Sequence, residues 1–360
     1  MPDDAMDALP PAVAEELRDA VMSAGIHEDR DLVLRILATG AGLGMDAPGR
    51  LDLKIVSASL EEMRAAFRLF APYVDVPKVT IFGSARTRQQ DALYRQTMDV
   101  TSALADRGWI AVTGAGPGIM QAAVQGAGPK RSIGVSIRLP FEEHPEDAVQ
   151  DDPNVVTMKY FFTRKLMLVK ESSGFICLPG GFGTLDEMFE LLTLQQTGKA
   201  EPVPIVLLDA PGGTFWAGLR RFVDEQLITT GVISPDDFDR VLITDSVDAA
   251  VSEITGFWRN YDSLRWVGHR LVLRLKADPT DAEIASLNER FGELAPDGGI
   301  ARTEPLRAER VDQDRLELPR LVLRLDQFRV GELHRLIRAL NALGSAPALD
   351  KTRWSRTTEG

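Results

Sequence analysis

The stretch GFICLPGGFGTLDE, residues 174–187, decides the fold class, because it joins a strand pattern to a helix pattern through a glycine turn. Its apolar beginning, residues 174–178, predicts a short buried strand, and a helix pattern follows the last glycine. Three glycines, Gly180, Gly181 and Gly183, let the backbone approach a ligand closely. The free N–H groups and the dipole at the start of a helix bind anions, so this turn is a candidate phosphate site.

The helix after this turn has a candidate cap and a candidate buried face. Thr184 is well placed to be the N-cap. The residues expected to be buried are spaced i, i+3, i+4 and i+7: Leu185, Met188, Phe189 and Leu192. Glu187 lies off that stripe, and its spacing leaves two interpretations open. It can complete a capping box with Thr184, or it can face the uncharged sugar of a ligand, since it would repel a phosphate. Glu190, one turn further on, is expected on a solvated face.

Six more short apolar runs alternate with helical segments after residue 78. They cover residues 79–82, 109–112, 133–137, 155–156, 204–208 and 241–243. Strands that alternate with helices predict a parallel sheet with helices on both faces, which is an α/β fold. Ligands of such sheets bind beyond the carboxyl ends of the strands, where the glycine turn of residues 179–183 would lie.

Two other strands of this series also end in glycine turns. Gly83 and Ser84 follow residues 79–82, and residues 114–118, with the sequence GAGPG, follow residues 109–112. Pro117 is expected in the first turn of the next helix. A dinucleotide-binding fingerprint does not fit, because an isoleucine stands where its third glycine should be. Each turn alone could equally be structural, but their place at strand ends makes Gly83, Ser84, Gly114 and Gly116 candidates to face a phosphate or a ribose.

A helical segment just upstream of residues 174–178 carries the adjacent basic residues Arg164 and Lys165. The apolar stripe of this segment, expected to be buried, consists of Phe162, Leu166 and Val169. The basic pair projects elsewhere, and such pairs most often face solvent. The helix can also pack near the glycine turn, because the strand that feeds the turn comes directly after it.

Both ends of the chain differ in pattern from the central part. Apolar spacing predicts helices throughout residues 1–72, with Gly40, Gly42 and Gly44 in a loop between the last two. After residue 260, the run RLVLRL at residues 270–275 recurs at residues 320–325, and a helix pattern follows each copy.

The repeat defines the order of elements in the C-terminal part. With a strand near residues 300–306, this order is β-α-β-β-α, which predicts a small ferredoxin-like α+β domain. The tail after residue 347 is expected to be loose. The predicted domains are therefore a helical extension (1–72), an α/β domain (73–260), a ferredoxin-like domain (261–346) and the tail (347–360).

Charge and composition narrow the class of protein. The chain has 360 residues and a net charge of −12, which repels nucleic-acid phosphates. Residues 261–360 hold 17 Lys and Arg against 16 Asp and Glu, so they do not predict nucleic-acid binding either. The one cysteine, Cys177, cannot form an internal disulfide or a zinc cluster. No histidines are spaced as metal ligands, so we expect no metal.

Targeting signals are missing from the pattern. The N-terminus is acidic and lacks the apolar core of a signal peptide. No apolar run reaches the roughly 18 residues of a membrane span. We therefore expect a soluble cytoplasmic protein without a membrane partner.

Taken together, these motifs resemble the LONELY GUY (LOG) family, long mislabelled as lysine decarboxylases. The resemblance rests on the signature PGGxGTxxE, met by residues 179–187, together with the Arg164-Lys165 pair, residues 114–120 and Gly83-Ser84. Residues 139–143, with the sequence LPFEE, are also similar to a segment of longer bacterial members. The resemblance covers residues 75–260, approximately, and implies a Rossmann-like fold.

The family implies a phosphoribohydrolase, which cleaves a nucleoside 5′-monophosphate of the AMP or cytokinin riboside type into free base and ribose 5-phosphate. It implies catalytic roles for Arg164 and Glu187, and no metal or redox cofactor. The residues implied or expected to bind the substrate are Gly83, Ser84, Gly114, Gly116, Lys165, Gly180, Gly181, Gly183 and Thr184. The family also implies a homodimer or a higher homo-oligomer, with residues near the interface completing the site.

One departure and two alternatives accompany this resemblance. Ala115 stands where many members have the middle glycine of three, which leaves the ligand contact there open. A non-catalytic nucleotide- or cofactor-binding carrier on the same fold would keep the glycine turns without needing Glu187. Lysine decarboxylation is a weaker alternative, because it normally requires pyridoxal phosphate and no lysine here has a recognisable Schiff-base context.

Overall fold

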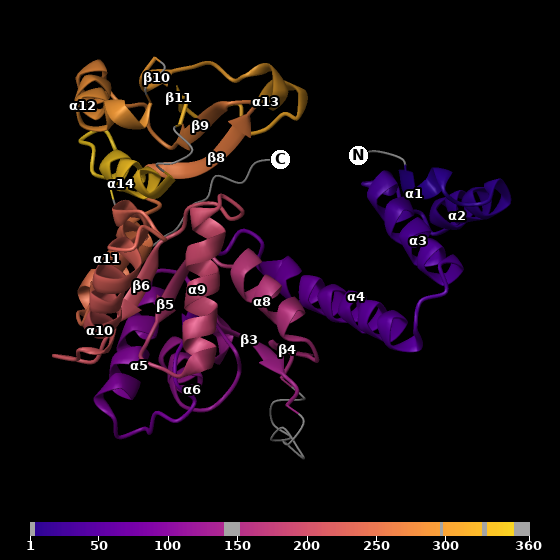
Figure 1. Cartoon of the computed structure of the whole chain (residues 1–360), viewed down its shortest axis with the longest axis horizontal. Coiled ribbons are helices and arrows are strands. Elements are labelled where there is room, and N and C mark those ends of the chain that lie inside the picture. The colour runs from indigo at the N-terminus through magenta and orange to yellow at the C-terminus, as the bar shows by residue number, and fades with distance from the viewer. Residues whose placement is uncertain (1–3, 140–151, 296–297, 326–329, 349–360) are drawn as a thin grey trace. The chain divides into compact units, whose positions relative to one another are not determined.

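A computed structural model describes residues 4–139, 152–295, 298–325 and 330–348 (Figure 1). The chain divides into two compact units, Met1–Arg64 and Ala65–Gly360. Residues 140–143 of the LPFEE segment, and residues 349–360 of the predicted tail, lie outside the described residues.

The first unit is helical, as predicted. Its helices are α1 (Asp4–Asp7), α2 (Pro11–Ser23), α3 (Arg30–Met45) and the first part of α4 (Arg50–Phe70), and α1 to α3 share a small core. The predicted loop at Gly40, Gly42 and Gly44 is wrong, because these glycines lie inside α3. Glycine weakens a helix by only about 1 kcal/mol, and the chain leaves α3 shortly before Pro48, which cannot continue a helix.

The second unit contains a sheet of seven parallel strands, and all seven predicted strands are confirmed. They are β1 (Lys78–Phe82), β2 (Ile110–Thr113), β3 (Ser132–Ile137), β4 (Val155–Met158), β5 (Gly174–Cys177), β6 (Ile205–Leu208) and β7 (Val241–Thr244). The strand order is β4-β3-β2-β1-β5-β6-β7, and every pairing is parallel. The order reverses at β1, so β1 and β5 flank the topological switch point at which ligands of such sheets bind.

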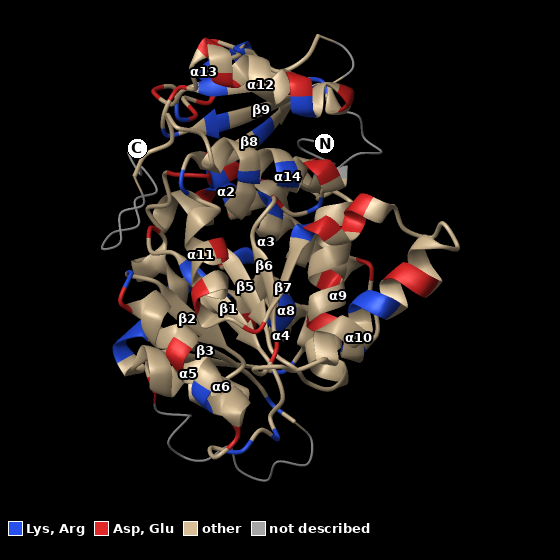
Figure 2. Cartoon of the chain, turned by 90° about the vertical axis from the view of Figure 1, so that its left-hand side faces the viewer, with Lys and Arg blue, Asp and Glu red and all other residues tan. Residues whose placement is uncertain are grey.

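Helices cover both faces of this sheet, which gives the predicted Rossmann-like architecture. The helices are α5 (Ala92–Ala105), α6 (Ile119–Ala127), α8 (Phe161–Lys170), α9 (Phe182–Gln196), α10 (Phe215–Phe222) and α11 (Val247–Gly256). Short 3-10 helices cover Ala71–Tyr73, Pro129–Arg131 and η4 (Pro235–Arg240), and a π-helix covers Val223–Ile228. From β1 to β4 each new strand is added on one side of the sheet, and from β5 to β7 each is added on the other side. Because the crossovers between parallel strands are right-handed, the connecting helices of the two series lie on opposite faces. Accordingly α5, α6 and α11 lie on one side of the sheet, and α9 and α10 lie on the other (Figure 2).

The C-terminal part forms a second, antiparallel sheet. Its elements are β8 (Tyr261–Val267), β9 (Arg270–Leu275), α12 (Asp281–Phe291), a 3-10 helix (Gly292–Leu294), β10 (Ala301–Arg302), α13 (Arg307–Val311), β11 (Arg320–Leu323) and α14 (Val330–Asn341). The strand order is β10-β11-β9-β8. The three predicted strands and the two predicted helices are present, but the short helix α13 lies between β10 and β11, where the predicted β-α-β-β-α order has none, and β10 covers only two residues. Strand β8 adds an edge strand that the sequence analysis missed. Polar residues in β8, such as Asp262 and Arg265, interrupt the apolar run that would have marked it.

The two sheets of this unit share one hydrophobic core. Leu271 and Leu273 of β9 belong to the same buried cluster as Ile176 of β5 and Ile254 of α11. The connection runs through Trp258, whose indole N–H donates to the carbonyl of Ser173 at 2.8 Å. The C-terminal sheet is therefore packed onto the parallel sheet.

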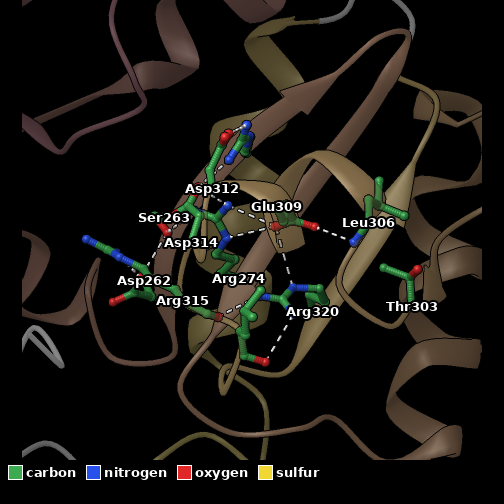
Figure 3. Close-up of polar contacts among 12 residues, drawn as sticks. Asp262, Ser263, Arg274, Thr303, Leu306, Glu309, Asp312, Asp314, Arg315 and Arg320 are labelled. Atoms are coloured by element: carbon green, nitrogen blue, oxygen red, sulfur yellow. Dashed lines mark hydrogen bonds and ion pairs between the residues drawn. The ribbon is translucent and has the colours of Figure 1, made fainter. Parts of the chain in front are cut away.

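A buried ionic network covers the other side of the antiparallel sheet (Figure 3). Because side chains alternate along a strand, Arg274 of β9 points away from the face of Leu273. Nη2 of Arg274 lies 2.8 Å from Oε1 of Glu309 on α13, and the carboxylate of Glu309 is fully buried. Nε of Arg320, from the second copy of the repeat, lies 3.7 Å from the same oxygen. Glu309 thus joins the two repeat copies and fixes α13 on the sheet.

Candidate active site

Three glycine turns lie together at the carboxyl edge of the parallel sheet. The backbone N–H of Ile119 donates to the carbonyl of Ser84 at 3.1 Å, which joins the turns after β1 and β2. A Cβ atom added to Gly180, after β5, would lie 3.1 Å from the backbone nitrogen of Ser84. A Cβ added to Gly83 would come within 2.6 Å of Ile119, so this packing requires glycine. The convergence predicted from the strand ends is confirmed.

The turn after β5 is shorter than predicted, and this changes the role of Thr184. Helix α9 begins at Phe182 with Gly181 as its N-cap, so the prediction that Thr184 is the N-cap is wrong. Thr184 and Gly183 lie in the first helical turn, and the capping box between Thr184 and Glu187 is absent. Thr184 is buried, and its hydroxyl fills the space that a side chain on Gly180 would need. The N–H groups of residues 182–184 precede the first bond of the helix, from Leu185 N to Gly181 O, as an anion site requires.

Glu187 lies on the buried face of α9, contrary to the predicted stripe. Only 7% of its surface is exposed. The buried residues of the helix are Thr184, Glu187, Met188, Leu191 and Gln195. Of the four apolar residues predicted to be buried, Met188 is buried, Leu185 and Leu192 are half-buried, and Phe189 is 39% exposed. The helix therefore turns a partly polar face inward, because its first turns line the carboxyl edge of the sheet.

Arg164 reaches from α8 into the turn after β2. Its Nε donates to the carbonyl of Val135 on β3 at 2.9 Å, and its Nη2 occupies the place of a side chain on Gly114. The alternative of a solvated basic pair is thus wrong for Arg164. The predicted apolar stripe of α8 is also wrong, since Phe162 and Leu166 are exposed and the buried residues are Thr163, Met167 and Leu168.

The electrostatics of the site couple Arg164 to Glu187. Burial raises the pKa of Glu187 to about 7, against the opposing charges of Lys165 and Arg164. Burial likewise lowers the pKa of Arg164, and the charge of Glu187 offsets part of this effect. The structure therefore brings together the two residues to which the family resemblance assigns catalytic roles. A buried carboxyl group with a strongly raised pKa, beside glycine turns at the carboxyl edge of a parallel sheet, is typical of a functional site.

Lys165 is held by two carboxylates of α9. Its Nζ lies 2.8 Å from Oδ2 of Asp186 and 2.8 Å from Oε2 of Glu190. Burial alone would lower the pKa of Lys165, but the hydrogen bonds that its ammonium group donates to these two carboxylates raise it. Glu190 is accordingly paired and half-buried, and is not the solvated residue we expected. Sequence reasoning missed this pairing, although Asp186 and Glu190 stand one helical turn apart, as a shared cation requires.

The turn after β2 contains a strained residue at the position where this chain departs from the family. Ala115 has a φ of +55°, in the left-handed region that favours glycine, and its N–H donates to Oγ1 of Thr113 at 3.1 Å. The thioether of Met120 packs against this turn, because a Cβ on Gly116 would lie 2.6 Å from its Cε. Pro117 precedes the helix, since α6 begins at Ile119 with Gly118 as its N-cap, so its predicted place in the first turn is wrong.

Metal-ligand clusters and membrane-spanning helices are two features that the described residues lack. Among residues 4–139, 152–295, 298–325 and 330–348, no three His, Cys, Asp or Glu side chains are grouped as metal ligands. Within the same ranges, every helix is too short or too polar to span a lipid bilayer.

Comparison with known proteins identifies the family of this chain. The model of a family described as "possible lysine decarboxylase" matches residues 118–254. A cytokinin riboside 5′-monophosphate phosphoribohydrolase from Mycobacterium tuberculosis is 35% identical over 156 residues, which cover 42% of this chain and 80% of that protein. The chain belongs to the LONELY GUY family. A second LONELY GUY relative, the enzyme of the same name from Mycobacterium marinum, is 34% identical over 155 residues, which again cover 80% of its length.

Among solved structures, the LONELY GUY chain is similar to the molybdenum cofactor binding protein of Rippkaea orientalis. The identity is 21% and the TM-score is 0.35, over 49% of this chain and 94% of that protein.

Proposed function

We propose that this LONELY GUY protein hydrolyses the N-glycosidic bond of a nucleoside 5′-monophosphate, giving a free base and ribose 5-phosphate. The observation that carries the proposal is the placement of buried Glu187 and of Arg164, whose charge acts on it, at the carboxyl edge of the sheet where three glycine turns meet. The family relatives named as phosphoribohydrolases support it, because the matched region of 156 residues covers most of their length.

The substrate phosphate would bind at the start of α9. The N–H groups of residues 182–184 are free of helix bonds at the start of α9, and Gly181 leaves open space for a ligand next to the backbone. Gly180 lets the turn pack closely against Thr184 and Ser84. Gly83 and Ser84 would close one side of this site, and Gly114 and Gly116 would face the ribose or the base. Thr184, whose hydroxyl lies against Gly180, would complete the phosphate contacts.

Glu187 would act on the ribose. Breaking the N-glycosidic bond builds positive charge on the sugar, and a fixed carboxylate beside it stabilises that charge. Glu187 lies further along α9 than the anion site, so its charge is separated from the phosphate. Its raised pKa of about 7 means that the ionised form, which this role needs, is gained as pH rises through neutrality.

Arg164 would assist the departing base or hold the phosphate. Its guanidinium donates several hydrogen bonds, and its bond to the carbonyl of Val135 fixes its direction. It is a poor proton donor, so it would stabilise developing negative charge on the base without transferring a proton.

We also propose that two copies associate through the outer faces of α8 and α9. These faces carry exposed aromatic and aliphatic side chains: Phe161, Phe162, Leu166, Phe182 and Phe189. Large apolar side chains gathered on a surface are typical of protein contacts. Light scattering of the full chain measures this directly, and a monomeric mass would contradict it.

We further propose a cytoplasmic location, where the single buried Cys177 stays reduced, and the four-part domain division given by the sequence analysis.

The test of the proposed function is a substrate panel. Purified full-length protein is incubated with AMP, cytokinin riboside 5′-monophosphates and pyrimidine monophosphates, and free base is measured by chromatography. We expect base release from at least one purine monophosphate and none from the matching nucleoside, which lacks the phosphate. Tight binding of a nucleotide without base release would instead identify a non-catalytic carrier.

A further inference from the structure

Lys165 occupies an unusual place beside the two candidate catalytic residues. It directly follows Arg164 on α8, yet its ammonium group turns to α9 and contacts Asp186 and Glu190 at 2.8 Å each. These two carboxylates stand one position before and three positions after Glu187. The side chain of Lys165 is only 16% exposed, so it is largely withdrawn from solvent.

The charges around Glu187 are unbalanced without Lys165. Three carboxylates, Asp186, Glu187 and Glu190, lie within two turns of α9, and the charges of Asp186 and Glu190 oppose ionisation of Glu187. The opposing cations are Arg164 and Lys165 of α8, and the neighbouring thiol of Cys177 on β5 stays neutral because burial raises its pKa. Arg164 is itself desolvated and bonded to Val135, which leaves Lys165 as the cation that binds α9 directly.

We infer that Lys165 is a positioning residue, which ties α8 to α9 through Asp186 and Glu190 and holds a positive charge beside Glu187. This inference rests on the proposed catalytic role of Glu187. It replaces the substrate contact expected of Lys165 from the sequence, because two of the three ammonium donors are already used by Asp186 and Glu190.

The inference is consistent with the strength of the contacts involved. Asp186 is 61% exposed, so its ion pair with Lys165 adds little to stability by itself. The pair matters through its effect on the buried neighbour, because the charge of Lys165 favours the ionised form of Glu187 and lowers the pKa of that carboxyl group. Replacing Lys165 should therefore change the pH dependence of activity much more than it changes the free energy of unfolding.

The test compares Lys165→Met with Lys165→Arg in the full chain, using AMP as substrate. The acid limb of the kcat profile should move up by about one pH unit in Lys165→Met. That shift corresponds to about a fivefold lower kcat at pH 7 and to less than a twofold change at pH 9. Lys165→Arg keeps the charge and should restore the wild-type profile. Lys170→Met is the matched control on the same helix, because Lys170 pairs with Glu171 and not with α9, and its profile should match the wild type.

A second measurement needs no catalysis. Carboxyl carbon NMR of Glu187, assigned by the signal that Glu187→Gln removes, should give a higher titration midpoint in Lys165→Met than in the wild type. An unchanged midpoint overturns the inference, and so does a tenfold rise in KM with an unshifted kcat profile, which a substrate-binding lysine would cause. If the wild type releases no base from any nucleotide, the proposed function fails, and the NMR titration still decides the role of Lys165.

Discussion

Replacing Glu187 with glutamine should make the protein more stable and less active at the same time. Burial raises the pKa of Glu187 from its ordinary 4.5 to about 7, so the folded state resists the ionised form. The shift of 7 − 4.5 = 2.5 units corresponds to about 3 kcal/mol of folding free energy. Glutamine has the same shape without the charge, so Glu187→Gln should raise the free energy of unfolding by about 3 kcal/mol at pH 8.

The difference in stability between the wild type and Glu187→Gln should depend on pH. Below pH 4.5 the carboxyl group is protonated in both states, and wild type and variant should be equally stable. Between pH 4.5 and 7 the unfolded chain loses a proton that the folded chain keeps, so the wild type loses stability as pH rises. Above pH 7 the full difference between the two proteins should be present and constant.

Activity should change in the opposite direction. If the carboxylate stabilises the ribosyl cation, its loss removes a charge that acts in the transition state, and kcat should fall by about 100-fold or more. Stability is measured by urea unfolding at pH 5, 6, 7 and 8, followed through the buried indoles of Trp109, Trp216 and Trp258. A variant that is less stable than the wild type at pH 8 would show that Glu187 is a structural residue. Base release within a few-fold of the wild type would refute its catalytic role.

Three further changes test other parts of the structure. Arg164→Ala should lower kcat/KM by more than 100-fold while unfolding at nearly the wild-type urea concentration, since its main partner is one carbonyl group; a mainly lowered stability would favour a packing role. Gly180→Ala should abolish AMP binding in calorimetry, because the new methyl group overlaps the hydroxyl of Thr184 and crowds the backbone of Ser84; unchanged binding would contradict the tight approach of the turns. Glu309→Ala should lower the free energy of unfolding by about 2–3 kcal/mol, because it removes the buried carboxylate that Arg274 and Arg320 share and leaves Arg274 with its ion pair to Asp314; a loss below 1 kcal/mol would mean that water reaches the network.

The parallel sheet could be predicted from the sequence because each of its strands has a recognisable local pattern. Runs such as residues 204–208 are continuous and apolar, and they are bounded by polar or glycine-containing segments. Strands buried on both faces need this pattern, and helices between them imply parallel pairing. The strand β8 escaped the same reasoning, because Asp262 and Arg265 are satisfied by distant partners, Arg315 and Asp314, that only the folded chain brings near.

Part of the candidate site could also be predicted from local sequence patterns. Glycine turns at strand ends can be recognised one at a time, and their convergence follows from a parallel sheet. The register of α9 could not be predicted from capping chemistry. Thr184 and Glu187 have the spacing of a capping box, yet the helix starts two residues before Thr184, because Gly181 serves as the N-cap.

The buried stripes of α8 and α9 were wrongly predicted for one physical reason. The same reason connects the candidate site with the proposed association of two copies. Apolar periodicity marks the face of a helix that avoids water, without saying whether the core or another molecule covers it. On α8 the residues Phe162 and Leu166, predicted to be buried, are exposed. The side chain of Arg164 instead points toward the sheet, where it bonds the carbonyl of Val135. On α9 Phe189 is exposed, while the inner face includes Glu187. Both helices therefore turn polar catalytic candidates toward the sheet edge and apolar side chains outward. The proposed association of two copies would cover these outer faces, so replacing Phe162 or Phe189 with a polar residue should lower both the mass measured by light scattering and the release of base.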